Sequence, residues 1–446
     1  MLIKDIMGKF QSKLYSRIFL IHSSLLAIVL SSQKSREIIL GLESNFFKDA
    51  GSGKLLFIVI SFFVFSMFAF ILPIFLGFFD KLSWDKRKYF SVIPSLSFLI
   101  YIVIPTYYKY FSGEIMFTDL AYSVEFLVDK SVQNVSDKSL VYPSSFLWIR
   151  NFSLPLDGMN LVLFLSILAT ITFMICIIHF SMKLRSSSAL IFAVLLVSPP
   201  IRWLFQSQNL DLFIIIALYF CSIVYLNNFG IRNSIGIFIL TLIALIKLYT
   251  VPVLFYLFFL TKSRFCRIQI TVSLCFLIPV LYTDTGKILG LLPIGADNNA
   301  IGIRILFYFL GFDRNLLSML SIIAGIITLV IVFVFISLRK SDVIHKVPIS
   351  SNIYMFSLII FALSMITTSS FPYRLIFLLF VIPLLFDRAN SSFDTVIASY
   401  AFVAFFCYTR SLGLIQNLFL LPILMTSIHS IMFLLLKNYQ NQKDVN

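Results

Sequence analysis

Long apolar runs separated by short polar intervals occupy almost the whole chain. The runs that we expect to form helices are residues 18–30, 55–79, 89–107, 159–180, 189–204, 210–226, 235–248, 251–260, 268–282, 317–338, 353–366, 372–386, 395–408 and 412–436. A straight helix needs roughly 20 apolar residues to cross a bilayer, and its backbone polar groups must be paired internally. The pattern therefore predicts an all-α, polytopic transmembrane helical bundle with about 12–14 apolar segments.

Two neighbouring runs, 235–248 and 251–260, are each too short for a straight span. Lys247, Tyr249 and Pro252 lie at or beside their junction. We expect a broken or re-entrant pair of helices, with the junction toward the outer side of the membrane. Broken helices of this kind also line the transport sites of some transporters.

Basic residues gather at alternate ends of the apolar runs. Clusters precede the first run and follow residues 79, 180, 260 and 338. Lys and Arg concentrate in cytoplasmic loops, so both termini are expected in the cytoplasm. The longest polar interval, 108–157, and a second loop, 283–304, are then external. We expect no cleavable signal peptide, and a bacterial inner (plasma) membrane as the location.

The first external loop contains a segment with helical periodicity. Between Glu114 and Lys130, apolar residues recur at the spacing of one helix face, which predicts an interfacial helix along the membrane surface. No linker or repeat divides the chain into separate folding units. We expect N-terminal membrane segments at 1–88, a core at 89–388 that carries both external loops, and C-terminal transmembrane helices at 389–446.

The composition agrees with an integral membrane protein. Of the 446 residues, 59% are hydrophobic and 12% are charged, whereas soluble domains carry about 25% charged residues. The net charge of +15 does not indicate nucleic-acid binding, because the basic residues lie in short loops at span ends. Membrane lipid is the expected partner.

The sequence contains no recognisable motif for a cofactor or a metal ion. The four His and five Cys residues show no metal-ligand spacing. We expect no organic cofactor. The sequence shows no set of metal ligands and Asp119 alone would hold a divalent ion weakly, so a role for a divalent metal stays open without support from the residues.

Asp119 lies between the exit of the 89–107 run and the expected surface helix. A carboxylate at the outer bilayer surface is a candidate general base for a hydroxyl group. An N-cap or a solvated acid on the surface helix is the structural alternative.

Three basic residues fall on the external side, against the general orientation. These are Arg202, Lys247 and Arg374. Long basic side chains can snorkel to an interface, which is the structural alternative. Cations in this position also suit an anionic ligand such as a phosphate. The outer face is therefore predicted to combine one base with several phosphate-binding cations.

These residues resemble the GT-C glycosyltransferases, and most closely the bacterial branch related to polyprenol-phosphate-mannose-dependent mannosyltransferases. The resemblance covers residues 89–386 and is carried by Phe117-Thr118-Asp119-Leu120-Ala121-Tyr122, Val141-Tyr142-Pro143, Gln208-Asn209, Ala244-Leu245-Ile246-Lys247-Leu248-Tyr249 and Tyr373-Arg374-Leu375-Ile376. The chain departs from that branch at Thr118, Leu120 and Ser144, where Gly, Phe and a second Pro are usual.

The resemblance implies an inverting hexosyltransferase. Such an enzyme moves a sugar, for example mannose, from a polyprenyl-phosphate donor to an extracytoplasmic lipid or glycan acceptor, with Asp119 as the catalytic base. The residues implied in binding the donor phosphate and the substrates are Lys247, Arg374, Arg202, Tyr122, Tyr142, Gln208, Asn209 and Tyr373.

Two other functions fit part of the pattern. Polysaccharide polymerases and O-antigen ligases usually place their largest external loop late in the chain, whereas here the longest loop is early. A lipid-linked oligosaccharide flippase or other transporter would explain the broken pair at 235–260. It would not explain the long early loop with its surface helix.

Overall fold

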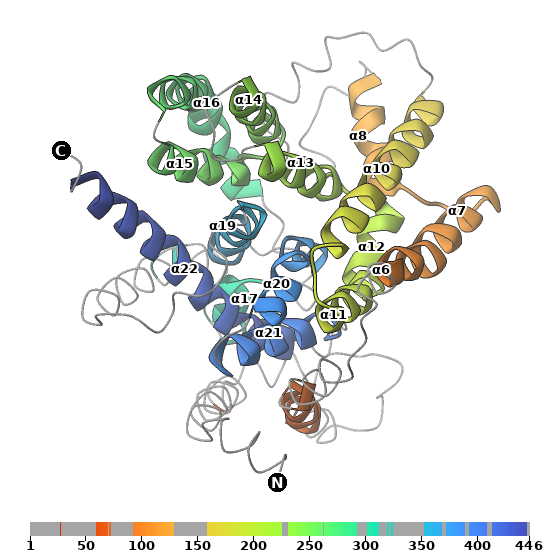
Figure 1. The fold of residues 1–446 in the computed structure, drawn as a ribbon. Coiled ribbons are helices and arrows are strands. Elements are labelled where there is room, and N and C mark those ends of the chain that lie inside the picture. Colours follow the sequence, from red (N-terminus) through yellow and green to blue (C-terminus); the bar gives the residue numbers. More distant parts are fainter. Residues whose placement is uncertain are drawn as a thin grey trace.

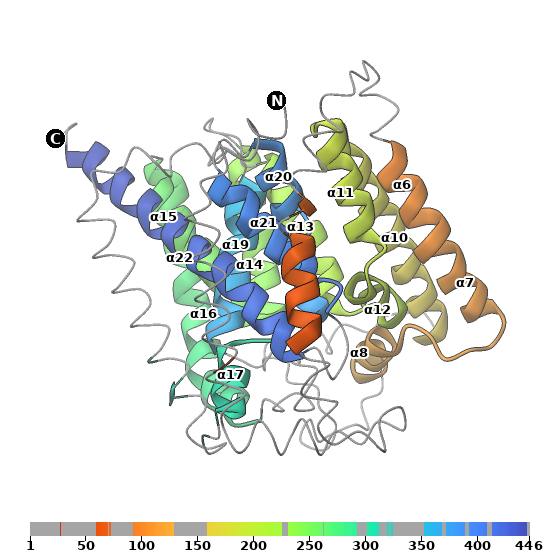
Figure 2. The same ribbon diagram turned by 90° about the horizontal axis from the view of Figure 1, so that it is seen from below.

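The computed structural model describes residues 27, 59–69, 71–72, 92–128, 158–224, 231–261, 263–291, 301–310, 312, 319–320, 323, 352–367, 372–388, 392–407 and 413–443. Within these ranges the chain is almost entirely helical and contains no β-strand, which confirms the all-α prediction. The helices form a bundle in which most of the long members run up or down Figure 2.

One side of the bundle is built from the earlier helices. They are α6 (Val92–Phe98), the π-helix η1 (Leu99–Val103), α7 (Ile104–Phe111), α8 (Thr118–Val128), α10 (Gly158–Ser181), α11 (Ser186–Leu196) and α12 (Pro199–Ser207). Figure 1 shows α6, α7, α8 and α10 together on the right of the bundle.

The remaining helices complete the middle and the other side. They are α13 (Leu210–Val224), α14 (Ile231–Ile246), the 3-10 helix η2 (Leu248–Thr250), α15 (Val251–Leu260), α16 (Arg264–Leu291), α17 (Ile303–Phe309), α19 (Asn352–Thr367), the 3-10 helix η3 (Pro372–Leu378), α20 (Val381–Arg388), α21 (Ser392–Ala404) and α22 (Gly413–Lys443). Helices α13, α19 and α20 lie between the two sides (Figure 1).

Among the residues that the structure describes, two helices are long and apolar enough to cross a membrane. They are the continuous stretch Val92–Phe111 and the α10 segment Met159–Ser181. A third candidate is the pair α11 and α12, which is bent by 54°. The exposed face of α10 carries a row of apolar side chains at helical spacing: Phe164, Ile167, Leu168, Ile171, Ile175 and Ile178. A row like this suits contact with lipid, as expected for an integral membrane protein.

Aromatic side chains join the elements in the core. The Phe98 ring of α6 lies 4.6 Å from Phe205 of α12 and 5.4 Å from Phe173 of α10, measured between ring centroids. Phe380, between η3 and α20, packs edge-on against Phe180 at 4.9 Å. Edge contacts of this type add to the stabilisation from burial alone. These contacts hold α12 and the segment between η3 and α20 against the long helices.

The two ends of the bundle differ in chemistry. At the upper end of Figure 2, the start of α11 meets the end of α20. There the Arg185 N–H donates to Oδ1 of Asp387 at 2.6 Å. Helices α8 and α12 lie toward the opposite end (Figure 2). Arg185 and Asp119 therefore lie toward opposite ends of the bundle.

Several predicted boundaries were wrong. The loop expected at 283–304 begins as helix, because α16 continues to Leu291. The prediction ended the helix where the apolar run ends. Polar residues such as Thr283 and Lys287 are compatible with a helix outside lipid, so the helix can continue past that point. The run at 372–386 is not one helix but η3 followed by α20. The runs at 18–30 and 317–338 fall largely outside the described residues.

The surface helix is also shorter than predicted. It begins at Thr118 rather than near Glu114, because Gly113 and Phe117 both have positive φ values, 84° and 59°. Residues with positive φ cannot continue a right-handed helix. Helix α8 packs through Leu120 and Val124 against Leu161 and Val162 of α10.

Candidate functional site

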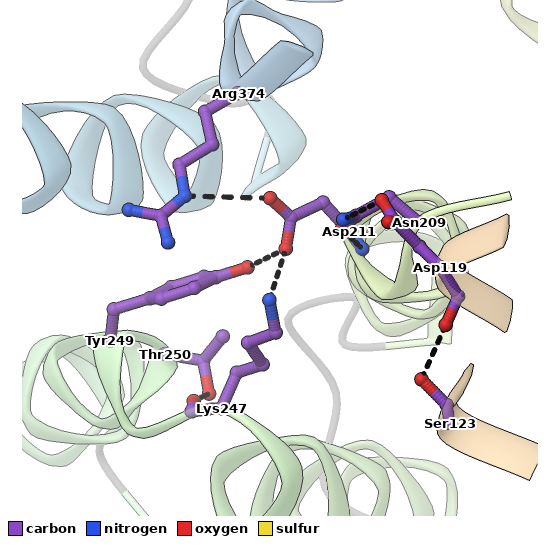
Figure 3. A network of polar contacts seen from close by, with 8 residues as sticks. All are labelled: Asp119, Ser123, Asn209, Asp211, Lys247, Tyr249, Thr250 and Arg374. Atoms are coloured by element: carbon purple, nitrogen blue, oxygen red, sulfur yellow. Dashed lines mark hydrogen bonds and ion pairs between the residues drawn. The ribbon is translucent and has the colours of Figure 1, made fainter. Parts of the chain in front are cut away.

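Asp211 is the centre of a buried polar cluster. It is the second residue of the apolar helix α13, and its side chain is fully buried. The Nζ atom of Lys247 lies 3.2 Å from Oδ1, and the Nε atom of Arg374 lies 3.5 Å from Oδ2. The Tyr249 hydroxyl donates a hydrogen bond to Oδ1. Figure 3 shows all three side chains pointing toward this carboxylate.

The three partners of Asp211 all lie where regular α-helix is interrupted. Lys247 stands between α14 and η2 with an extended backbone, φ −142° and ψ 107°. The Thr250 hydroxyl and N–H both donate to the Lys247 carbonyl, at 2.9 and 3.2 Å, which closes the turn. Arg374 lies in η3. The junction predicted between 235–248 and 251–260 is therefore present, and it aims Lys247 and Tyr249 inward.

This cluster contains two positively charged side chains and one negatively charged side chain. A buried carboxylate is costly unless it is paired, and Asp211 has two cations and a hydroxyl donor. The cations share one carboxylate, so the three ionised groups carry a formal charge of +1. Both cations also lie near the Tyr249 ring, with Lys247 Nζ at 5.8 Å and Arg374 Cζ at 5.1 Å from its centroid. Their side chains are 13% and 14% exposed, whereas Asp211 is 0% exposed. The positive side of the cluster therefore faces the accessible region.

Asn209 connects this cluster to Asp119. Its Nδ2 donates to Oδ2 of Asp119 at 2.7 Å, and its Oδ1 accepts the Asp211 N–H at 3.0 Å. Asp119 is half-buried in the first turn of α8. Within the described part of the chain, its other oxygen, Oδ1, accepts no hydrogen bond. That oxygen is free to accept a proton.

Both backbone segments that carry these acids have unusual geometry. Phe117 and Gln208 are the non-glycine residues with positive φ in the described ranges, at 59° and 50°. Such a conformation costs on the order of 1–3 kcal/mol and is enriched at functional sites. Phe117 is fully buried between Tyr107 and Tyr110, and its N–H donates to the Gln206 carbonyl at 2.7 Å. The start of α8 is thereby fixed to the end of α12.

The structure gathers four of the predicted site residues: Asp119, Asn209, Lys247 and Arg374. Gln208 is also buried beside them, and within the described residues neither side-chain heteroatom has a hydrogen-bond partner. Tyr122 is 52% exposed on α8, and Arg202 is exposed on α12. The contacts described for the cluster include neither of these two. Tyr142 and the Tyr373 side chain lie outside the described residues.

Sequence reasoning missed the role of Asp211. The residue follows the Gln208-Asn209 pair closely in the sequence but is not among the predicted site residues. The available signal was its place in the first turn of a strongly apolar helix, because ionisable residues in such helices are rare and are usually paired. Its partners lie 36 and 163 residues further along the chain, so spacing could not reveal them.

The charged side chains of the site favour binding of an anion rather than of a metal ion. Among the described residues, no group of three or more His, Cys, Asp and Glu side chains could hold a metal ion. The arrangement offers two partly exposed cations and a nearby carboxylate with a free oxygen. It can hold a negatively charged group and accept a proton beside it.

Comparison of the chain with protein-family models, curated proteins and solved structures finds no match in any of the three. Because a fold does not determine function, the side chains of the site carry the functional argument.

Proposed function

We propose that this protein is an inverting, membrane-embedded glycosyltransferase of the GT-C type. It moves a hexose from a polyprenyl-phosphate donor to an extracytoplasmic lipid or glycan acceptor, with Asp119 as the general base. Lys247 and Arg374 hold the donor phosphate. One observation carries the proposal: a half-buried carboxylate with a free oxygen, Asp119, is linked through Asn209 and Asp211 to two partly exposed cations.

The charge of the cluster supports this donor. Asp211, Lys247 and Arg374 together carry a formal charge of +1 when all three are ionised. A phosphate joined to both a sugar and a polyprenyl chain carries a single negative charge. Arg offers a fork of donors and Lys a mobile ammonium, and both are common phosphate-binding groups.

The transfer step uses these groups in fixed roles. The acceptor hydroxyl gives its proton to Oδ1 of Asp119 while its oxygen attacks the anomeric carbon of the sugar. The bond between that carbon and the phosphate oxygen breaks, and its electron pair stays with the phosphate. The leaving polyprenyl phosphate gains a second negative charge, which Lys247 and Arg374 stabilise. Attack opposite the leaving group inverts the anomeric carbon.

The surroundings of the site suit a lipid-linked donor. Helix α8 packs on α10, whose outer face is apolar over its length. A polyprenyl chain can lie in the lipid beside such a face, while its phosphate reaches the cations. The expected orientation places this end of the bundle outside the cytoplasm.

A transporter of an anionic lipid-linked substrate is the second candidate. The break at Lys247 and the 3-10 helix around Arg374 favour it, since discontinuous helices carry the substrate sites of many transporters. A transporter would bind the same phosphate without needing a free carboxylate oxygen at Asp119.

Transfer of radiolabelled sugar from a panel of polyprenyl-phosphate sugars separates the two functions. Asp119→Asn should lower turnover by a factor of about 10²–10⁴ while membrane insertion and donor binding persist, because only the proton acceptor is lost. Asp387→Asn, at the other end of the bundle, is the matched control and should retain transfer. Normal turnover by Asp119→Asn would rule out Asp119 as the base, and binding without any transfer would favour transport.

A further inference from the structure

The turn between α12 and α13 reaches both halves of the site. Gln208, Asn209 and Asp211 are all buried there. The Asn209 side chain contacts Asp119, and the Asp211 side chain contacts Lys247 and Arg374. One short segment therefore touches the candidate base and both cations.

We infer that Asp211 is a positioning residue, which holds Lys247 and Arg374 side by side in the geometry that receives a phosphate. The inference rests on the proposed function, because it takes a phosphate as the ligand of the two cations. It adds a role for a residue that is 0% exposed and so does not meet the ligand itself.

Three observations support a positioning role. Lys247 and Arg374 come from separate elements, and like charges repel each other at short range. Asp211 binds them through different oxygens, Lys247 through Oδ1 and Arg374 through Oδ2. The Tyr249 ring lies close to both cations, and its hydroxyl donates to the same carboxylate. Figure 3 shows how the carboxylate stands between the two basic side chains.

The same turn also fixes the distance between the cations and the base. The Asp211 N–H donates to Oδ1 of Asn209, and Nδ2 of Asn209 donates to Asp119. The left-handed conformation of Gln208 ends α12 just before these two residues. A movement of the turn would therefore displace the phosphate-binding cations and the carboxylate of Asp119 together.

Positioning and simple charge balance predict opposite results for Asp211→Asn. If Asp211 only reduced the local positive charge, its neutralisation would make the cluster more positive and would tighten phosphate binding. If Asp211 positions the cations, its neutralisation lets two long side chains separate and weakens binding. In catalysis, misplacement of positioned groups by about 1 Å can cost on the order of 100-fold in rate, and we take this sensitivity to geometry as the upper bound for the loss of binding.

The test measures binding of tritiated undecaprenyl phosphate to the full-length protein in lipid nanodiscs. We expect Asp211→Asn to weaken binding by about 10- to 100-fold. Asp211→Glu keeps the charge but adds a methylene, and should weaken binding less. Asp387→Asn is the matched control, because Asp387 is another buried carboxylate but pairs with Arg185 at the opposite end. This control should bind like the wild type.

The outcomes distinguish failure of the positioning role of Asp211 from failure of the proposed function. Unchanged or tighter binding by Asp211→Asn overturns the positioning role and leaves the proposed function intact. Absence of binding by the wild type overturns the proposed donor together with this inference. If Asp211→Asn is not recovered folded, Asp211→Glu decides: weaker binding at a wild-type melting temperature supports positioning, and unchanged binding refutes it.

Discussion

Replacement of Lys247 by Met probes how the buried charges depend on one another. Met preserves a long side chain but removes the ammonium that lies 3.2 Å from Asp211. Removing one partner of a buried ion pair typically costs about 3–5 kcal/mol. Arg374 and the Tyr249 hydroxyl remain near Asp211, so we expect the free energy of unfolding to fall by about 2–4 kcal/mol.

A second substitution makes the prediction sharper. In the double variant Lys247→Met with Asp211→Asn, the buried carboxylate of Asp211 no longer needs a compensating cation. Tyr249 can still donate to the Asn oxygen, and Arg374 is 14% exposed and can reach water. The double variant should therefore be more stable than Lys247→Met alone, with a coupling free energy of about 1–3 kcal/mol.

Unfolding by SDS in mixed micelles, followed by circular dichroism, measures both variants. Lys183→Met is the matched control, because Lys183 is exposed, and it should change the free energy of unfolding by less than about 0.5 kcal/mol. Two results would refute the reasoning. One is a cost for Lys247→Met as small as that of the control. The other is a double variant whose cost equals the sum of the two single costs.

Three further predictions concern individual contacts. Tyr249→Phe removes a hydroxyl that donates to the buried Asp211 carboxylate, so it should cost about 1.5–3 kcal/mol in the same unfolding assay. Phe117→Gly removes backbone strain but also a fully buried ring; the loss of the ring dominates, and we expect a net cost of about 2–4 kcal/mol together with slower sugar transfer. Ser166→Ala should cost less than about 1 kcal/mol, because the Tyr107 hydroxyl keeps its contact with Thr170 at 3.1 Å.

The sequence by itself determined the class of structure. Its apolar runs require helices in lipid, and α10 follows the run 159–180 within a few residues at each end. The break at Lys247 was also predictable, since two runs too short for a straight span meet beside Pro252. Asp119, Lys247 and Arg374 stood out because charged residues are rare in such a chain and need partners.

Only the tertiary structure decided which partners those charges have. Asp211 meets Lys247 and Arg374 because α13, the α14–η2 junction and η3 converge, and convergence depends on packing rather than on spacing along the chain. The extent of α16 was likewise hidden, since a helix can continue into water after its apolar residues end. Arg202 had the same sequence signal as the two site cations, but the packing of α12 leaves it on the exposed side of that helix.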